Sequence, residues 1–192
     1  MWTYIKNIFK KPEPKPVETV APDVKPVEIK KTGYSLTDIN KYQLAFIRGI
    51  GRTETDFSLK EAYSEAYNKE SNNANVRQYG QDGADYGYYQ NNGLDVKEAI
   101  KKGIDPKIAV HLNGGGKGGK STLEEQTIAM HEYLKMKYPK VYDALKTGSI
   151  ESFDIAVKTM NRHWFGLNDR PEQAKKEFMR ASKTDVIFPE IK

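Results

Sequence analysis

The chain has 192 residues, of which 38% are hydrophobic and 30% charged, a composition that suits one folded domain with additional segments. It contains no cysteine, which excludes disulfides and zinc–thiolate sites, and no apolar run approaches the ~18 residues of a transmembrane helix. The net charge of +5 favours an acidic partner such as nucleic acid, an anionic membrane or the bacterial cell wall, but residues 33–192 lack a Lys/Arg run dense enough for a nucleic-acid-binding arm, so we expect no nucleic acid.

The N-terminal part divides into two segments. Residues 1–11 can form a short amphipathic helix that touches a membrane surface or a partner protein, or they form a frayed terminus; both interpretations stay open. Positive charges follow the apolar residues of this segment instead of preceding them, so we expect no cleavable signal peptide. Residues 12–32 contain five prolines among Lys, Glu and Val, which predicts an extended, semi-rigid linker. Together they would tether the domain formed by residues 33–192.

The first half of this domain predicts two helices, a turn region and a strand. Apolar residues recur at helical spacing from Ser35 to about Ile50, where Gly49 and Gly51 weaken the helix end. A second set of apolar residues at helical spacing follows from Leu59 to Tyr67. The predicted elements are a helix over 35–50, a helix over 59–70, turns over 71–83 and a strand over 86–90.

The second half is predicted to be helical around a glycine loop. Thr122 and Glu125 belong to a capping-box pattern, and Pro171 suits the first turn of a last helix. The expected fold class is therefore α+β, mostly α-helical with a small β-hairpin or sheet. The predicted elements are short helices over 96–102 and 106–112, a glycine loop over 113–120, and helices from 123, over 150–162 and over 171–181.

Two glutamates are candidates for a general acid. A Glu at a helix end, against apolar walls, can keep its proton and donate it to a glycosidic oxygen. Glu54 follows a strongly apolar helix, and Glu70 follows a weaker amphipathic one. Most glutamates are solvated surface groups, so the helix end alone does not select either residue.

Short motifs resemble those of lysozyme-like enzymes. Residues 51–58 (Gly-Arg-Thr-Glu-Thr-Asp-Phe-Ser) resemble the Glu-Ser-Gly-Phe-Asn acid motif of soluble lytic transglycosylases, and Gly-Tyr-Tyr-Gln at 87–90 resembles their Gly-Leu-Met-Gln strand. Residues 85–92 (Asp-Tyr-Gly-Tyr-Tyr-Gln-Asn-Asn) are similar to a strand of animal c-type lysozymes, in which the acid begins a Glu-Ser-Asn motif, as at 70–72. The resemblance covers about 45–165 and implies a lysozyme-like domain.

The two comparisons select different acids. Glu70 lies 15 residues before Asp85, near the lysozyme interval, whereas Glu54 lies 31 residues before it. The more strongly apolar helix and the motif aromatic Phe57 favour Glu54, which then requires an inserted helix over 59–70. We favour Glu54 and keep Glu70 as the alternative.

The resemblance also implies roles for other residues. Asp85 would stabilise positive charge on the sugar or position a water. Gln90 would hydrogen-bond the sugar, and Asn161 matches the Asn of the Tyr-Asn-Ala-Gly segment of the transglycosylases. Tyr86 and its neighbours Tyr88 and Tyr89 have apolar faces suited to stacking on sugar rings, although at least one of them must point into the core. No metal or cofactor is implied.

Two further patterns need an interpretation. Residues 114–121 satisfy the G-x-x-x-x-G-K-S phosphate-binding pattern after the apolar residues 108–110, but the helical remainder offers no further parallel strands for a nucleotide-binding fold. The dispersed His111, His131 and His163 are expected to make local hydrogen bonds instead of binding a metal.

The resemblance therefore implies a peptidoglycan-cleaving glycosidase, either a lytic transglycosylase or a muramidase. Bacterial peptidoglycan is the expected partner, and residues 1–11 would contact other virion proteins or a membrane surface. The expected location is a phage virion or the periplasm and cell wall of the host. The alternatives are a non-catalytic wall-binding or structural virion protein with a degenerate lysozyme fold and, less favoured, a P-loop nucleotide-binding protein.

Overall fold

The computed structural model describes residues 35–63, 85–115, 119 and 121–183. The chain divides into two compact units, Met1–Thr32 and Gly33–Lys192. The predicted amphipathic segment 1–11, the linker 12–32 and the turn region 71–83 lie outside the described residues. All statements below concern the second unit.

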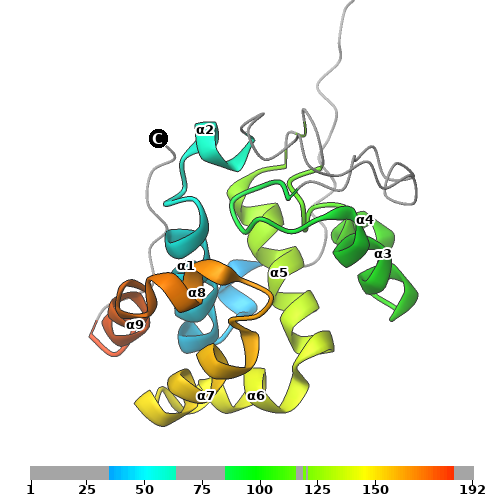
Figure 1. Ribbon diagram of the computed structural model, residues 1–192. Coiled ribbons are helices and arrows are strands. Elements are labelled where there is room, and N and C mark those ends of the chain that lie inside the picture. The colour runs from blue at the N-terminus through cyan, green and yellow to red at the C-terminus, as the bar shows by residue number, and fades with distance from the viewer. Residues whose placement is uncertain (1–34, 64–84, 116–118, 120, 184–192) are drawn as a thin grey trace, which may run out of the picture. The chain divides into compact units, whose positions relative to one another are not determined.

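The described chain is mostly helical, as predicted (Figure 1). The helix expected over 35–50 is split, because Asn40 begins a new helix by accepting a hydrogen bond from Tyr42 N–H. Three elements over 139–147 and 165–169 are absent from the sequence prediction. The elements are η1 (Leu36–Asp38), α1 (Lys41–Glu54), α2 (Leu59–Ala62), α3 (Gly93–Lys101), α4 (Pro106–Ala109), α5 (Leu123–Lys137), α6 (Pro139–Ala144), η4 (Leu145–Thr147), α7 (Ile150–Met160), α8 (Phe165–Asp169) and α9 (Pro171–Arg180).

Helix α1 is the central element of the core and packs chiefly against α9. Contrary to expectation, it continues through Gly49 and Gly51 to Glu54. A Cβ on Gly49 would lie 3.2 Å from Ala174 of α9, so the glycine allows close helix packing instead of ending the helix. The buried Glu177 of α9 forms ion pairs with Arg48 Nε at 2.8 Å and Arg180 at 3.1 Å. Apolar contact and paired charge therefore join the two helices.

Helix α5 is the second long element, and its start was predicted correctly. Thr122 is the N-cap, and the Thr122 and Glu125 side chains form the reciprocal hydrogen bonds of a capping box. Beyond its C-terminal end the chain folds back through α6 and α7 towards α8 and α9 (Figure 1). The predicted start of α9 at Pro171 is also confirmed.

The predicted strand at residues 86–90 is not found. Tyr86 and Asn91 form an isolated antiparallel bridge, and the residues between them form a turn with φ +80° at Gly87 and +50° at Gln90. Tyr88 and Tyr89 are both buried, although alternation in a strand would place them on opposite faces. A turn whose aromatic residues are buried on all sides has the amino-acid composition of a β-strand, which explains why a strand was predicted. The described residues contain no β-hairpin or sheet.

Candidate active site

Glu54 is the last residue of α1 and precedes a sharp reversal of the chain. Asp56 and Phe57 follow with φ values of 49° and 58°, the left-handed region that non-glycine residues rarely adopt. Two such residues in succession are strained, and backbone strain of this kind concentrates at functional sites. Phe57 is buried, and its ring meets that of Tyr89 edge to face, with 6.4 Å between ring centroids. This packing holds the strained turn in place.

Helix α8 holds the carboxyl group of Glu54. Gly166 N–H donates to Glu54 Oε1 at 2.8 Å, across 112 residues of sequence. A Cβ on Gly166 would lie 2.4 Å from the Thr53 carbonyl oxygen and 2.8 Å from Glu54 Oε1, so only glycine allows this approach. The Arg170 guanidinium donates to the same Thr53 carbonyl. Both ends of α8 are therefore attached to the last turn of α1.

The surroundings of Glu54 favour its protonated form. Burial raises the pKa of Glu54 above its ordinary value of 4.5, and the nearby negative charges of Asp85 and Asp169 raise it further. The Gly166 hydrogen bond and the positive charge of Arg170 oppose this rise without cancelling it. A carboxyl group that keeps its proton at higher pH is what a general acid requires.

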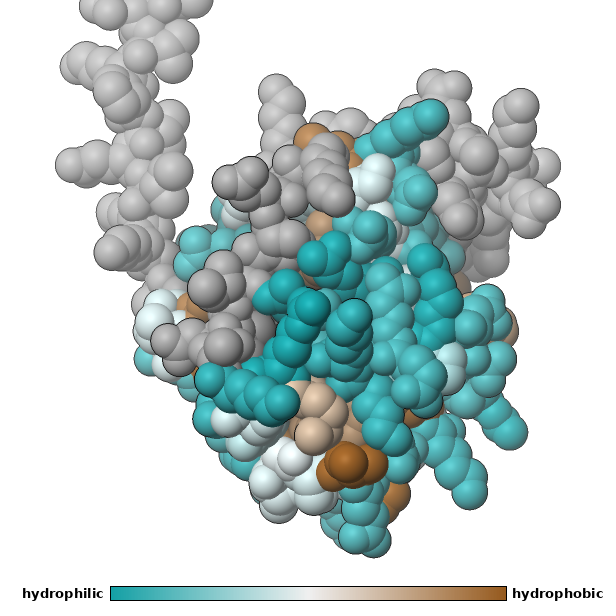
Figure 2. All heavy atoms as spheres, turned by 90° about the vertical axis from the view of Figure 1, so that its left-hand side faces the viewer, coloured by the Kyte–Doolittle hydropathy of each residue, from teal (hydrophilic) through white to brown (hydrophobic). Residues whose placement is uncertain are grey.

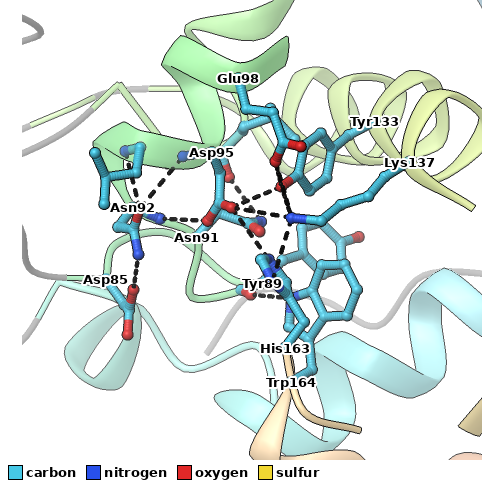
Figure 3. Close-up of polar contacts among 12 residues, drawn as sticks. Asp85, Tyr89, Asn91, Asn92, Asp95, Glu98, Tyr133, Lys137, His163 and Trp164 are labelled. Carbon is cyan, nitrogen blue, oxygen red and sulfur yellow. Dashed lines mark hydrogen bonds and ion pairs between the residues drawn. The ribbon is translucent and has the colours of Figure 1, made fainter. Parts of the chain in front are cut away.

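Asp85 interacts electrostatically with Glu54, as the predicted site requires. It begins the segment that leads into the aromatic turn, and its Oδ1 accepts a hydrogen bond from Asn92 Nδ2 at 3.2 Å (Figure 3). Its side chain is solvent-accessible, but the protein atoms around it desolvate the carboxyl and raise the pKa of Asp85; Asp95 raises it further, while Asn92 and His163 oppose the rise. The negative charge of Asp85 therefore acts on the carboxyl group of Glu54.

The three tyrosines of the turn are buried and do not reach the surface. Tyr86, Tyr88 and Tyr89 are all buried, which contradicts the expectation that they stack on sugar rings. Thr55 Oγ1 donates to the Tyr88 carbonyl at 3.0 Å, which joins the end of α1 to the turn. Tyr89 O–H and Thr127 Oγ1 share a hydrogen bond at 2.7 Å. The three tyrosines therefore pack inside the domain, and none of them, Tyr86 included, offers an exposed ring to a sugar.

The remaining predicted residues have mixed positions. Gln90 is half-buried, and its side-chain amide donates to the Gly87 carbonyl at 2.8 Å, so that group stabilises the turn. Asn161 is half-buried and caps the C-terminus of α7. Sugar contacts by Gln90 and Asn161 stay predictions. Glu70 lies outside the described residues.

A buried polar network beside the site was not predicted (Figure 3). Asp95 Oδ1 accepts a hydrogen bond from Tyr133 O–H at 2.6 Å and lies 3.2 Å from His163 Nε2. Lys137 Nζ donates to Glu98 Oε2 at 2.9 Å and lies 3.8 Å from Asp95 Oδ1. The network connects α3, α5 and the segment that leads into α8. Its one sequence signal is the Asn-x-x-Asp capping box at 92–95, which marks a helix start and not a buried site.

Opposing effects act on the carboxyl group of Asp95. Burial by itself raises its pKa, but hydrogen bonds and attraction from His163, with the donors of Tyr133 and Asn92, outweigh burial and lower the pKa of Asp95 below its ordinary value of 3.8. Asp95 is thus held as a carboxylate, whereas Glu54 is held towards the acid form.

The histidines make local hydrogen bonds, as predicted. His111 Nδ1 lies 2.8 Å from Ser121 Oγ, His131 Nδ1 lies 2.8 Å from Tyr142 O–H, and His163 contacts Asp95. In the described ranges, no group of three or more His, Asp or Glu side chains has an arrangement that could hold a metal ion.

The phosphate-binding pattern at 114–121 lacks its structural context. A phosphate-binding loop of this kind follows a strand, but Ile108 and Ala109 belong to α4, and residues 111–115 are a turn. Residues 116–118 and 120 lie outside the described part.

Comparison of the chain with protein-family models, with curated proteins and with solved structures gave no significant match. Among the helices that the structure describes, none combines the length and apolar character needed to cross a membrane. The face of the domain that carries α9 is largely hydrophilic, with a small group of hydrophobic residues (Figure 2).

Proposed function

We propose that the protein is a peptidoglycan-cleaving glycosidase in which Glu54 is the general acid. The observation that carries the proposal is the Glu54 carboxyl group, which is half-buried at a helix end, held by Gly166 N–H, and kept towards its protonated form. The negative charge of Asp85, which raises the pKa of Glu54, supports it, because glycoside hydrolysis uses a proton donor together with a group that stabilises the positive charge on the sugar.

The chemistry assigns a role to each carboxyl group. Glu54 protonates the oxygen between N-acetylmuramic acid and N-acetylglucosamine, and the bond to the anomeric carbon breaks as positive charge develops on the sugar. Asp85 stabilises that charge. In a muramidase a water then attacks the anomeric carbon, and Glu54, now a carboxylate, accepts the proton of that water. In a lytic transglycosylase the same carboxylate accepts the proton of the muramic acid hydroxyl, whose oxygen bonds to the anomeric carbon and closes an anhydro ring. The basic chain would adsorb to the acidic wall of the host, and we place the protein in a phage virion or at that wall.

The test compares Glu54→Gln with Glu70→Gln on purified sacculi, with products identified by mass spectrometry. We expect Glu54→Gln to lose at least about a hundredfold in rate, the lower range for removing an acid catalyst, and Glu70→Gln to stay active. Glu172→Gln, on the exposed side of α9, is the control for removing one carboxylate. Full activity of Glu54→Gln, with loss in Glu70→Gln, would transfer the acid role to Glu70. Anhydro ends among the products identify a transglycosylase.

A second candidate is a wall-binding or structural virion protein without catalysis. The observation that favours it is the burial of Tyr86, Tyr88 and Tyr89, which leaves none of these rings exposed for a sugar. Sedimentation with sacculi that releases no soluble fragments would support this candidate over the glycosidase.

A further inference from the structure

Phe165 is the one aromatic side chain of the described residues that is exposed, with 71% of its surface accessible. Single exposed apolar residues are common on proteins, so exposure alone indicates nothing. The position of Phe165 distinguishes it. It is the first residue of α8 and directly precedes Gly166, whose N–H binds Glu54. The ring therefore belongs to the surroundings of the proposed acid.

The backbone that carries Phe165 is fixed on both sides. Trp164 is buried, and its indole N–H donates to the Tyr89 carbonyl at 3.0 Å. Gly166 is fixed by Glu54, and the buried Leu167 donates its N–H to the Trp164 carbonyl at 3.1 Å. An exposed ring on a fixed backbone presents its face without a large loss of conformational freedom on binding, which is what a binding residue requires.

Covalent geometry limits the distance from Phe165 to the acid. Two bonds separate Phe165 Cα from Gly166 N, so this Cα lies no more than about 5 Å from Glu54 Oε1. Successive side-chain positions of a helix point about 100° apart. The Gly166 position faces Glu54, so the Phe165 side chain points about 100° away from that direction and not to the opposite side of α8. Leu167, two positions on, takes the buried side. The backbone of Phe165 thus lies close to the Glu54 carboxyl group, and its exposed ring starts from that point.

We infer that Phe165 is the stacking platform of a glycan-binding subsite beside Glu54. The inference rests on the proposed function, since it takes the same glycan as ligand. The C–H face of a pyranose ring is apolar and covers a flat aromatic ring, while the sugar hydroxyls stay in water. The tyrosines that the sequence suggested for this role are buried, so Phe165 is the aromatic ring that the described surface offers to a sugar.

Binding is tested in the Glu54→Gln background, where the glycan is not cleaved and the Gln side-chain oxygen can still accept from Gly166 N–H. The probe is chitopentaose, titrated by calorimetry. We expect Phe165→Ala and Phe165→Leu to weaken binding by about tenfold, and Phe165→Trp to keep it, because a flat ring is needed. Ile150→Ala is the matched control, since Ile150 is 45% exposed at the start of α7.

The outcomes separate this inference from the proposed function. Unchanged binding by Phe165→Ala, no binding of chitopentaose by the parent, or a lowered melting temperature of Phe165→Ala each overturns the subsite, even if the wild-type protein cleaves sacculi. Conversely, ring-dependent binding by a wild-type protein that releases no fragments from sacculi supports the subsite and overturns the glycosidase.

Discussion

At the scale of single residues, the Glu54 site combines predictable and unpredictable features. The sequence marks Glu54 because an apolar helix precedes it and Phe57 follows it. It does not mark Gly166, because a glycine in the first turn of a short helix has no local pattern that indicates contact with a residue 112 positions away. The left-handed Asp56 and Phe57 were equally unexpected, since neither residue is a glycine.

The raised pKa of Glu54 predicts a pH-dependent stability difference between the wild-type protein and Glu54→Gln. Between the ordinary pKa of 4.5 and the higher native pKa, the native state binds more protons than the unfolded state, so wild-type stability falls as pH rises through this window. Gln carries no charge and does not titrate. We therefore expect Glu54→Gln to melt at a higher temperature than wild type at pH 8, with a difference that shrinks towards pH 4.

Thermal melts at pH 4, 6 and 8 check this prediction. Glu172→Gln controls for the loss of one carboxylate at an exposed position. A melting difference for Glu54→Gln that does not change with pH, or a lower melting temperature at pH 8, would contradict the assignment of Glu54 as a desolvated acid.

At the scale of elements, capping signals predicted helix starts better than they predicted helix ends. Thr122 with Glu125 and Pro171 each mark an observed start. The end of α1 was misjudged because Gly51 was taken as a weak point, whereas a Cβ there would lie 2.6 Å from the Phe57 ring. Local propensity favours a break, but tertiary packing fills the space that the glycine leaves.

The Asp95 network, which connects α3, α5 and the segment before α8, is expected to stabilise the folded domain. Asp95→Asn removes the buried charge that Lys137 and His163 face, so we expect a loss of about 3–5 kcal/mol in the free energy of unfolding at pH 7. Because the pKa of Asp95 is lowered in the native state, its contribution is present above pH 3.8 and is lost as pH falls through the native pKa. The difference from wild type should therefore narrow in acid.

Urea unfolding at pH 7 and at pH 3 measures the effect of Asp95→Asn. Asp143→Asn is the control, because Asp143 is 70% exposed in its pair with Lys146 and should change stability by less than about 0.5 kcal/mol. If Asp95→Asn and Asp143→Asn are equally mild at pH 7, the network does not hold the three segments together.

At the scale of the whole molecule, the chain divides between residues 32 and 33, where the proline-rich composition ends. The hydrophobic core identified in the described part, from Ala45 to Ala181, belongs to the second unit. Residues 1–32 are thus a segment whose composition predicts a tether, and its function as a tether stays a prediction.

Removal of residues 1–32 should leave the domain formed by residues 33–192 intact. We expect the truncated protein to keep the wild-type melting temperature and its rate on soluble glycan fragments, because the core lies in Gly33–Lys192. Localisation or assembly in the virion should be lost. Thermal melts, fragment assays and localisation of both proteins form the measurement, and a truncated protein that still localises and assembles would contradict the tether.

The sequence alone determined the mostly helical composition and the major helix starts, and it narrowed the candidate acid to Glu54 or Glu70, because helical periodicity and capping act over a few residues. Only the tertiary structure decided that residues 86–90 form a turn and not a strand. A turn whose side chains are buried on every side has the same aromatic composition as a strand, so the sequence does not distinguish them. It also decided which groups interact with the carboxyl groups of Glu54 and Asp95. Gly166, Asp85 and His163 come from distant parts of the chain, and chain folding alone determines which distant residues share a low-dielectric environment that changes a pKa.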